Sequence, residues 1–590
     1  MRKEKKNSKI LFFLVLTILA IIKQILAGEL PLVALPIEKF DDGWMMKLGY
    51  NIANHNWLGQ FDSLTLMKEL VGPIYLALCS RLGLSFIGTS TLLYSIACII
   101  FVYSIQELFK KRWLLMLVYV VLLFNPVSYA SWTLQRVYRC GLTLTQVLIL
   151  FGCFFALYVK RKNSTRSLIL WSVGAGLSLA AIYHTREDRI WVLPFVIVVT
   201  IVLVVNTIIN SKYKNKKLTI KDINYRRLVL VLLPIVILMI FRSGLSYLNY
   251  KHYGLYSTNM IDDSNFSRAV SCFYQIKTDD DEELPRISVP ASKLEVLYEA
   301  SPTLSKIKEK LNAQWYAWGQ TRNGENENGM IIWPLISAVE ECGYYETATK
   351  ADNFYKNVAD ELEAAIKNNE VESRWTMPSP LMAPWRNEYL TELPKTMLNF
   401  TIQSIKFKNV YAQCIVGSPS LLYPSISSTI NGNSQYIIRG AENIEEFRFV
   451  EALTNDLAIK EGDNYVMEKK QKIVHRINRI TPIYNIIFPV LSVLGVLAYV
   501  LISFKNLFDW KRKVQNKLFF DIWLILSSII LSYIVLIGGV SYNQVSGVES
   551  GYYMYRSGGY PLLIAFVMIS ITFVVDKYLF ENRNNKSNGR

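Results

Sequence analysis

The sequence predicts a polytopic α-helical membrane protein with a mainly helical domain outside the membrane. Of its 590 residues, 52% are hydrophobic, and many uninterrupted apolar runs have the length that crosses the roughly 30 Å of bilayer hydrocarbon. The formal charge of +17 lies in short basic clusters between these runs, which is typical of cytoplasmic loops rather than of a nucleic-acid-binding surface. The hydrophilic residues 251–482 are numerous enough for a soluble domain.

The first expected span is residues 10–27. Residues 1–9 hold five basic side chains, and no small-residue cleavage site follows the apolar run, so we expect an uncleaved span with a cytoplasmic amino end. Nine more spans are expected from the apolar runs at 86–109, 113–129, 141–159, 167–184, 190–210, 228–247, 484–504, 518–540 and 560–580.

Ten spans place every basic cluster on one side of the membrane. The clusters lie at 110–112, 160–166, 212–227, 505–517 and in the tail that ends at 590, so both termini are expected in the cytoplasm. This parity requires that the apolar stretch 71–84 does not cross, and its brevity and internal Arg81 predict a helix at the outer interface. A composition rich in lysine, asparagine and isoleucine, without an organellar targeting signal, favours a bacterial plasma membrane.

The chain then divides into an amino-terminal membrane module (1–250), an outer domain (251–482) and carboxyl-terminal spans with a cytoplasmic tail (483–590). Within the outer domain, apolar residues at helical spacing predict helices in 292–311 and in 344–366.

Other parts of the outer domain give weaker signals. The polar stretches 279–283 and 321–329 predict solvated loops. The seven cysteines of the chain form no CxxC motif and no Cys/His cluster, which predicts neither a zinc site nor a disulfide framework. One disulfide among Cys272, Cys342 and Cys414 is left open.

Four outer loops carry charged and aromatic side chains that a plain scaffold does not require. Arginines bind phosphate oxygens in bidentate fashion, aromatic rings stack on sugars, and a carboxylate takes up a proton. Together on one membrane face, these groups predict a site for a substrate with an anionic phosphate, a sugar and a lipid tail. The candidates are Asp41, Asp42, Trp44, His55 and Lys68 in the first loop, Arg136 and Arg139 in the second, Arg186 and Glu187 in the third, and Tyr555 and Arg556 in the fourth.

Each residue also has a structural interpretation. The Asp pair suits a helix cap or a turn, Lys68 suits lipid headgroups, and residues 186–189 suit a local ion-pair lattice. The aromatic residues suit an interfacial belt, and lone histidines such as His55 and His184 are more often structural than catalytic. The combination of all these groups on one face favours a functional site.

On these residues the chain resembles the GT-C glycosyltransferases, among them the protein O-mannosyltransferases and the lipid A aminoarabinose transferases. Those enzymes place an acidic pair in the first outer loop and a Lys-Pro-Pro-type segment before an interfacial helix. Here Asp41-Asp42 matches the acidic pair. The segment Lys-Glu-Leu-Val-Gly-Pro, which begins at Lys68, stands where those enzymes have the Lys-Pro-Pro-type segment. The resemblance covers residues 10–210. It implies a GT-C-like transmembrane module that transfers a sugar from a polyprenyl-phosphate-linked donor to an acceptor outside the cytoplasmic membrane.

The chain departs from this family pattern at two places. Lys68 is followed by Glu69 rather than by proline. The second loop carries Gln135-Arg136 where the aminoarabinose transferases carry an acid, so a second carboxylate falls to Glu187 or Asp188.

The reaction implied by the resemblance is an inverting transfer. A carboxylate of the pair, with Asp41 favoured over Asp42, deprotonates or orients an acceptor hydroxyl. The cationic candidates stabilise the leaving phosphate, and Trp44, His55 and Tyr555 contact the substrate. A divalent cation, Mg²⁺ or Mn²⁺, bridging Asp41, Asp42 and the phosphate is compatible with this chemistry but not required by it. The acceptor is left open among a cell-wall polysaccharide, a teichoic acid, a glycolipid and a protein of the cell envelope.

Three other functions stay open. A polysaccharide polymerase or ligase takes an oligosaccharide donor, often linked through a diphosphate, and shares the outward-facing chemistry. A flippase-type transporter of a lipid-linked saccharide needs ionisable residues at mid-membrane depth and often internal symmetry, whereas the ionisable residues here gather at span ends and no repeat is evident. A sensor or scaffold would use the outer domain and not the charged loops.

Overall fold

The computed structural model describes residues 2–31, 42–215, 224–278, 284, 286–321, 323–376, 382–413, 464–514, 516–548 and 550–579. Within these ranges the chain is largely helical, and the only β interaction is an isolated antiparallel bridge between Ile276 and Ser373. Asp41, Cys414 and the acidic stretch 279–283 lie outside the described residues.

Nine helices of the described ranges are long and apolar enough to cross a membrane. A polytopic membrane protein is therefore confirmed, and each of the nine overlaps a predicted span. They are α1 (Arg2–Ala27), α4 (Phe86–Ile105), α6 (Cys140–Val159), α7 (Thr165–Tyr183), α8 (Leu193–Asn215), α9 (Tyr225–Tyr253), α20 (Thr481–Lys511), α21 (Lys517–Ser546) and α22 (Gly559–Val574).

The tenth predicted span, 113–129, is not one continuous helix. Helix α5 (Arg112–Leu123) ends early, and the short turns η2 (Pro126–Ser128) and η3 (Ser131–Gln135) follow at an angle of 58°. Pro126 explains the break, because the residue before a proline is driven out of the helical region and Asn125 is extended at φ −61° and ψ 144°. After this break, the second loop (130–139) lies at the end of the bundle.

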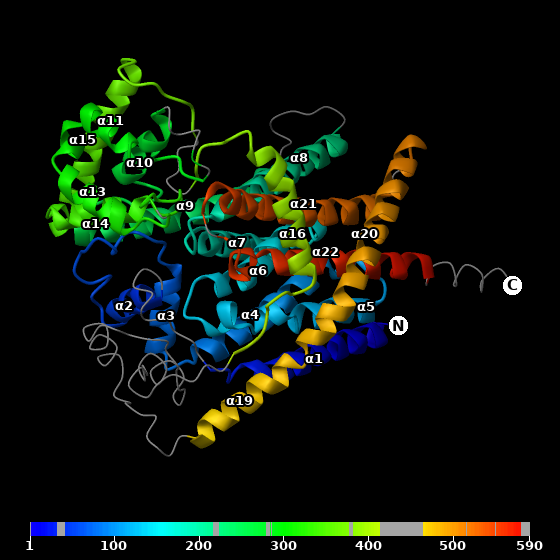
Figure 1. Ribbon diagram of the computed structural model, residues 1–590. Coiled ribbons are helices and arrows are strands. Elements are labelled where there is room, and N and C mark those ends of the chain that lie inside the picture. Colours follow the sequence, from blue (N-terminus) through cyan, green and yellow to red (C-terminus); the bar gives the residue numbers. More distant parts are fainter. Residues whose placement is uncertain are drawn as a thin grey trace.

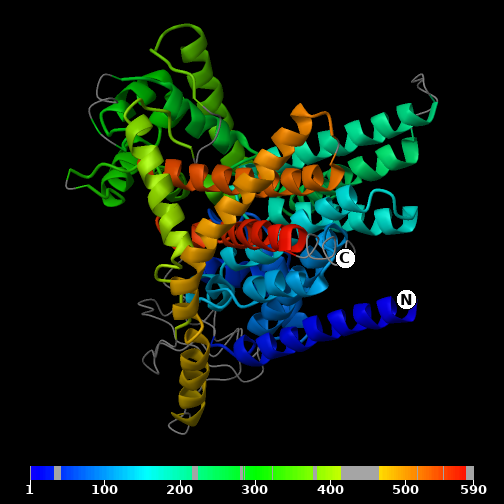
Figure 2. The ribbon, with the colours of Figure 1, turned by 90° about the vertical axis from the view of Figure 1, so that its right-hand side faces the viewer.

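The helices differ in how far they are enclosed. Helices α6 and α22 are buried along most of their length, whereas α1, α8, α9 and α20 expose many apolar side chains. In Figure 2, α1 (dark blue) lies at the edge of the bundle. Close approach between α4 and α6 depends on Gly152, where a Cβ would lie 3.1 Å from the Phe101 Cα, as is common for small residues at membrane helix interfaces.

The bundle has two ends, which we name the terminal face and the loop face. At the terminal face, the backbone N–H groups of Lys110 and Lys111 donate to Asp576 near the end of the chain, and Arg161 pairs with Asp521 at 3.4 Å. Basic clusters that are distant in sequence thus lie at one end of the bundle, where Figure 1 also shows the start of α1 and the end of α22. The loop face is the opposite end, which carries residues 42–85, 130–139, 184–188, 547–548 and 550–558.

A separate group of helices lies beyond the loop face (Figure 1). It contains α10 (Asn265–Gln275), α11 (Lys293–Ala300), α12 (Pro302–Ser305), α13 (Lys308–Ala317), α14 (Ile332–Glu341) and α15 (Ala348–Lys367). The predicted helices in 292–311 and 344–366 are confirmed, although Pro302 divides the first of them. The core of this outer group of helices includes Phe266 of α10, which packs edge to face against Tyr355 of α15.

Two helices of the range 251–482 pack outside this group. Helix α16 (Tyr389–Ile405) packs against α21 and α20, and α19 (Asn464–Asn478) leads into α20 and packs on α1. Cys272 and Cys342 are free thiols, so the disulfide left open among three cysteines does not join these two, and Cys414 lies outside the described residues.

Two short helices complete the loop face: α2 (Asp42–Ala53) and α3 (Val71–Arg81). With 11 residues, α3 is too short to cross hydrocarbon, as predicted for this stretch. Arg81 Nε donates to the Ala53 carbonyl at 2.6 Å and joins the ends of the two helices. Trp44 and Leu48 of α2 share a hydrophobic core with the outer helices, so α2 fixes the first loop between the bundle and the outer group.

Candidate functional site

Side chains from all four predicted loops gather at the loop face, and we name this group the loop site. One network joins members from the first three loops, and Arg186, Asp188 and Tyr555 form a second network. Every member is linked to another by a hydrogen bond, an ion pair or a cation–π contact; for Trp132 this is the Arg136 guanidinium carbon, 4.9 Å from its ring centroid, and the other contacts follow. The members are Asp42, Trp44, Lys68 and Glu69 from the first loop, Trp132, Arg136, Tyr138 and Arg139 from the second, His184, Arg186, Glu187, Asp188 and Arg189 from the third, and Tyr555 from the fourth.

Asp42 anchors one end of the loop site. It is the first residue of α2 and is fully buried, and Arg136 Nε lies 2.8 and 2.9 Å from its two carboxylate oxygens. A carboxylate at a helix amino end is stabilised by the helix dipole, and a charge-assisted contact of this length is strong. Asp42 therefore fixes the position of Arg136.

Tyr138 is the centre of a cationic cluster. Its ring centroid lies 4.8 Å from the Arg136 guanidinium carbon, 5.3 Å from that of Arg139 and 5.9 Å from Lys68 Nζ. Lys68 Nζ also lies 5.0 Å from the Trp44 ring. Aromatic faces attract cations at these distances, so the rings of Tyr138 and Trp44 hold three positive charges close together.

Glu187 ties the second loop to the first. Its Oε1 accepts from Arg139 Nη1 at 2.6 Å and from the Glu69 backbone N–H at 3.0 Å. Burial by itself raises the pKa of Glu187, but the Arg139 charge and hydrogen bond, with the Lys68 charge, lower that pKa to about 2. Glu187 is therefore a structural anion and a very weak base at neutral pH.

Glu69 is the second buried acid of the site and was not among the predicted candidates. Its Oε1 accepts from Arg189 Nη1 at 2.5 Å and from Asn259 Nδ2 at 2.6 Å, and its Oε2 lies 2.7 Å from His184 Nδ1. These partners are 115 to 190 residues away in the chain, so no local pattern in the sequence reveals them. The residue that breaks the Lys-Pro-Pro pattern thus joins the first loop to the third loop and to the outer region.

Arg186 forms the side of the site nearest the fourth loop. It donates to both carboxylate oxygens of Asp188, at 2.9 and 2.5 Å, and Nη1 donates to Cys140 Sγ at 2.9 Å. The Tyr555 ring centroid lies 5.5 Å from its guanidinium carbon. Of the local lattice considered for residues 186–189, only the pair Arg186–Asp188 is local, because Glu187 and Arg189 reach other loops.

Two candidates point elsewhere. His55 is exposed at the far end of α2 from Asp42, with φ at 62°. Arg556 is buried and donates to the Phe400 carbonyl at 3.4 Å and to Gln403 Oε1 at 3.1 Å, so it holds α16 instead of joining the loop site. Asp41 lies outside the described residues.

The described residues contain no group of three or more His, Cys, Asp or Glu side chains arranged to hold a metal ion. Both oxygens of Asp42 already face the Arg136 cation. The divalent cation predicted for Asp41 and Asp42 stays a prediction, because Asp41 is outside the described part of the chain.

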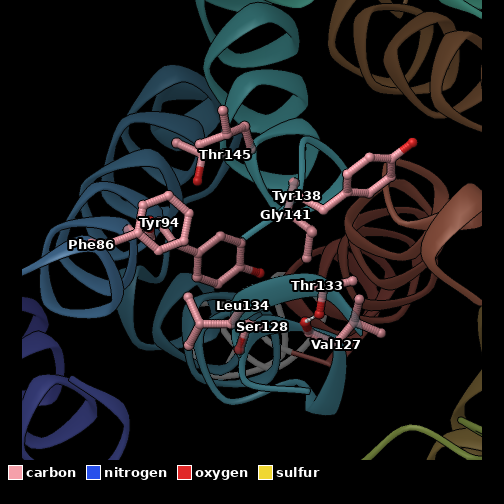
Figure 3. A pocket seen from close by; sticks show the side chains of 12 residues that line it. Phe86, Tyr94, Val127, Ser128, Thr133, Leu134, Tyr138, Gly141 and Thr145 are labelled. Atoms are coloured by element: carbon pink, nitrogen blue, oxygen red, sulfur yellow. Dashed lines mark hydrogen bonds between the residues drawn. The ribbon is translucent and has the colours of Figure 1, made fainter. Parts of the chain in front are cut away.

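Two pockets adjoin the loop site. A nearly all-apolar pocket of about 270 Å³ lies between α6, α8 and α21, and its lining runs from Trp191, at the loop end of α8, to Tyr158 and Leu524, near the terminal ends of α6 and α21. A much smaller cavity of about 20 Å³ reaches Tyr138. Figure 3 shows Phe86 and Tyr94 of α4 on one side of it and Tyr138 and Gly141 on the other.

Comparisons with protein-family models, with curated proteins and with solved structures gave no match to this chain.

Proposed function

We propose that this protein is a membrane glycosyltransferase that transfers a sugar, with inversion, from a polyprenyl-phosphate-linked donor to an acceptor outside the cytoplasmic membrane. The acceptor class is a cell-wall polysaccharide, a teichoic acid, a glycolipid or a protein. The loop face is the extracytoplasmic side in this proposal, because the basic clusters meet at the terminal face, and the membrane is the bacterial plasma membrane.

The observation that carries the proposal is a cationic site at the loop face together with an apolar pocket whose lining begins at Trp191, on the same face. Trp191 lines the apolar pocket and is two residues from Arg189. It also approaches Gly558, where a Cβ would lie 3.1 Å from the Trp191 ring, three residues after Tyr555. An amphiphile with an anionic head and a long apolar chain suits this pairing, with the chain in the pocket and the head among the arginines.

The loop residues divide the chemistry between them. Lys68, Arg139 and Arg186 stabilise the phosphate charge that develops on the leaving group. Trp44 and Tyr555 offer ring faces to the sugar. Asp42 keeps Arg136 oriented, and Asp41 is assigned to orienting the acceptor hydroxyl.

The transfer step balances without a cofactor. The acceptor oxygen forms a bond to the anomeric carbon while the bond from that carbon to the phosphate oxygen breaks. The phosphate oxygen leaves with the electron pair, and a carboxylate takes the acceptor proton. Polyprenyl phosphate is a good leaving group, so no general acid is needed.

The test is sugar transfer by purified protein in lipid nanodiscs, with synthetic polyprenyl-phosphate monosaccharides and crude acceptor extract. Arg139→Ala is expected to lower the rate at least tenfold, because it removes one stabilising charge. Arg268→Ala is the matched control, since Arg268 pairs with Asp360 and Glu363 on the exposed surface of the outer helices. Equal rates for both variants would contradict the proposed role of the loop site.

A further inference from the structure

Helix α19 has two contrasting faces. The face that packs on α1 is apolar and consists of Ile473, Val474 and Ile477, which share a hydrophobic core with Ala27 at the loop-face end of α1. Residues three or four apart lie on the same face of a helix. This apolar face therefore sets the position of α19 beside α1, and the opposite face is left exposed.

The exposed face carries a basic stripe, which we define as Lys472, His475, Arg476 and Arg479. All four side chains are exposed, and their spacing of three or four residues places them in one row along α19 and the turn that follows it. The row is about 10 Å long, at a rise of about 1.5 Å per residue. An open pocket of about 440 Å³ lies between these side chains.

Little of the charge on the basic stripe is neutralised. Lys472 pairs with Glu468 at 3.7 Å, but both side chains are exposed, and such a pair is weak. Arg479 contacts the His475 ring at 3.4 Å, and no carboxylate of the described residues pairs with Arg476 or Arg479. The stripe therefore presents net positive charge to its surroundings.

The basic stripe lies next to the membrane. Arg479 is two residues before Thr481, where α20 begins, and the apolar run of that span starts at residue 484. In Figures 1 and 2, α19 continues from α20 past the loop-face end of α1, at the edge of the protein. Because the hydrocarbon ends where the apolar run ends, the stripe lies at the level of the lipid headgroups.

Membrane orientation does not account for these cations. The basic clusters at 110–112, 160–166 and 505–517 are at the terminal face, and the basic stripe is at the opposite end of the bundle. Basic side chains near span ends are typical of one side of the membrane only. A cluster at the other end therefore indicates binding to a negatively charged group.

We propose that the basic stripe binds the phosphate-bearing headgroups of anionic phospholipids in the leaflet at the loop face. Arginine and lysine side chains bind phosphate oxygens through charge-assisted hydrogen bonds, and basic clusters beside a span attract anionic lipid. The open pocket gives a phosphate access to Lys472, Arg476 and Arg479 together. This inference is independent of the proposed glycosyl transfer.

A soluble polyanion is the other class of partner with this chemistry. The lipid is favoured by position, because the stripe begins two residues from a span and its helix is fixed to the end of a second span, α1. A headgroup at this level is beside the stripe at all times, whereas a polymer would have to reach it from solution.

The experiment is photocrosslinking in nanodiscs that contain equal amounts of phosphatidylglycerol and phosphatidylcholine. Gln471 is uncharged and lines the same pocket, so Gln471→benzoylphenylalanine places the photoreactive group beside the stripe. Mass spectrometry gives the ratio of the two lipid adducts, and an excess of phosphatidylglycerol is expected. Lys472→Gln, Arg476→Gln and Arg479→Gln should each lower this ratio about fivefold, which is the contribution of one basic side chain near an anionic surface.

Two control variants separate charge from other effects. Arg476→Lys combined with Arg479→Lys keeps the charge and should keep most of the excess. Lys350→Gln combined with Lys356→Gln removes two exposed cations from α15 of the outer group and should leave the ratio unchanged. The substituted side chains of both controls are exposed, so the apolar face that holds α19 is intact in every variant.

Three results would overturn the proposal. The first is an equal yield of both lipid adducts in the protein with the intact stripe, or no lipid adduct at all. The second is a triple glutamine variant that keeps the phosphatidylglycerol excess. The third is loss of the lipid adducts when polyphosphate is added at constant ionic strength, which would assign the stripe to a soluble polyanion.

Discussion

The buried ion pair between Asp42 and Arg136 should dominate the stability of the loop site. The two side chains are 0% and 4% exposed. Removing one partner of such a pair leaves an uncompensated buried charge and costs about 3–5 kcal/mol. Asp42→Asn and Arg136→Met should each lower the free energy of unfolding by about this amount.

A double-mutant cycle isolates the contact itself. Asp42→Asn combined with Arg136→Met removes both charges, so its cost should fall short of the sum of the single variants by roughly 2 kcal/mol, within the range measured for residues in direct contact. The assay is denaturant unfolding in detergent micelles, with loss of helical circular dichroism as the signal. Costs that add to within about 0.5 kcal/mol would refute the reasoning, because independent sites behave in that way.

The pair Lys47–Asp62 on the same helix and loop supplies the control. Its N–O distance of 2.5 Å is shorter than that of the buried pair, but its side chains are 44% and 32% exposed. Solvent screens such pairs, so Lys47→Met should cost only about 0–1 kcal/mol. A loss as large as that of Arg136→Met would show that distance, and not burial, sets the energy.

Three further predictions concern the residues that connect the loop site and the pocket. Glu69→Gln should destabilise the protein by about 1–3 kcal/mol, because it weakens the buried carboxylate that binds Arg189, His184 and Asn259. Native-state hydrogen exchange should become faster in the third loop. Unchanged protection there would contradict this role of Glu69. Tyr138→Leu should lower the rate of sugar transfer, because three cations lose their shared ring. Tyr138→Phe keeps the ring and should retain most of the activity. Equal activities of the two variants would exclude the cation–π role. Val198→Trp, which fills the apolar pocket, should slow transfer from long-chain donors but not from short-chain analogues, and equal slowing of both would place the lipid chain elsewhere.

Predictions from the sequence succeeded where a single physical property decides the structure. Apolar runs of membrane length identified each of the nine membrane-length helices in the described part of the chain, and the spacing of the basic clusters placed these clusters on one face. The break after α5 was missed because the strongly apolar run 113–124 dominated the prediction, although Asn125 and Pro126 follow it directly. The role of α16 was missed for a different reason, since it packs on α21 while its sequence neighbours belong to the outer region.

The loop site divides in the same way. Residue type and loop position were enough to gather Asp42, Lys68, Arg136 and Arg139, because buried charges need partners and these were the charges available on that face. Arg556 is on the expected loop, but its side chain binds Phe400 and Gln403 of α16. No pattern in residues 541–559 predicts this contact. Glu69 escaped prediction because the groups that bind it are distant in sequence.

The most direct test of the account is a structure of this protein in nanodiscs with a bound polyprenyl phosphate. The account predicts the phosphate among Lys68, Arg139 and Arg186, with the polyprenyl chain in the apolar pocket between α6, α8 and α21. A phosphate held at the terminal face, or a chain lying against other helices with the loop site vacant, would contradict it.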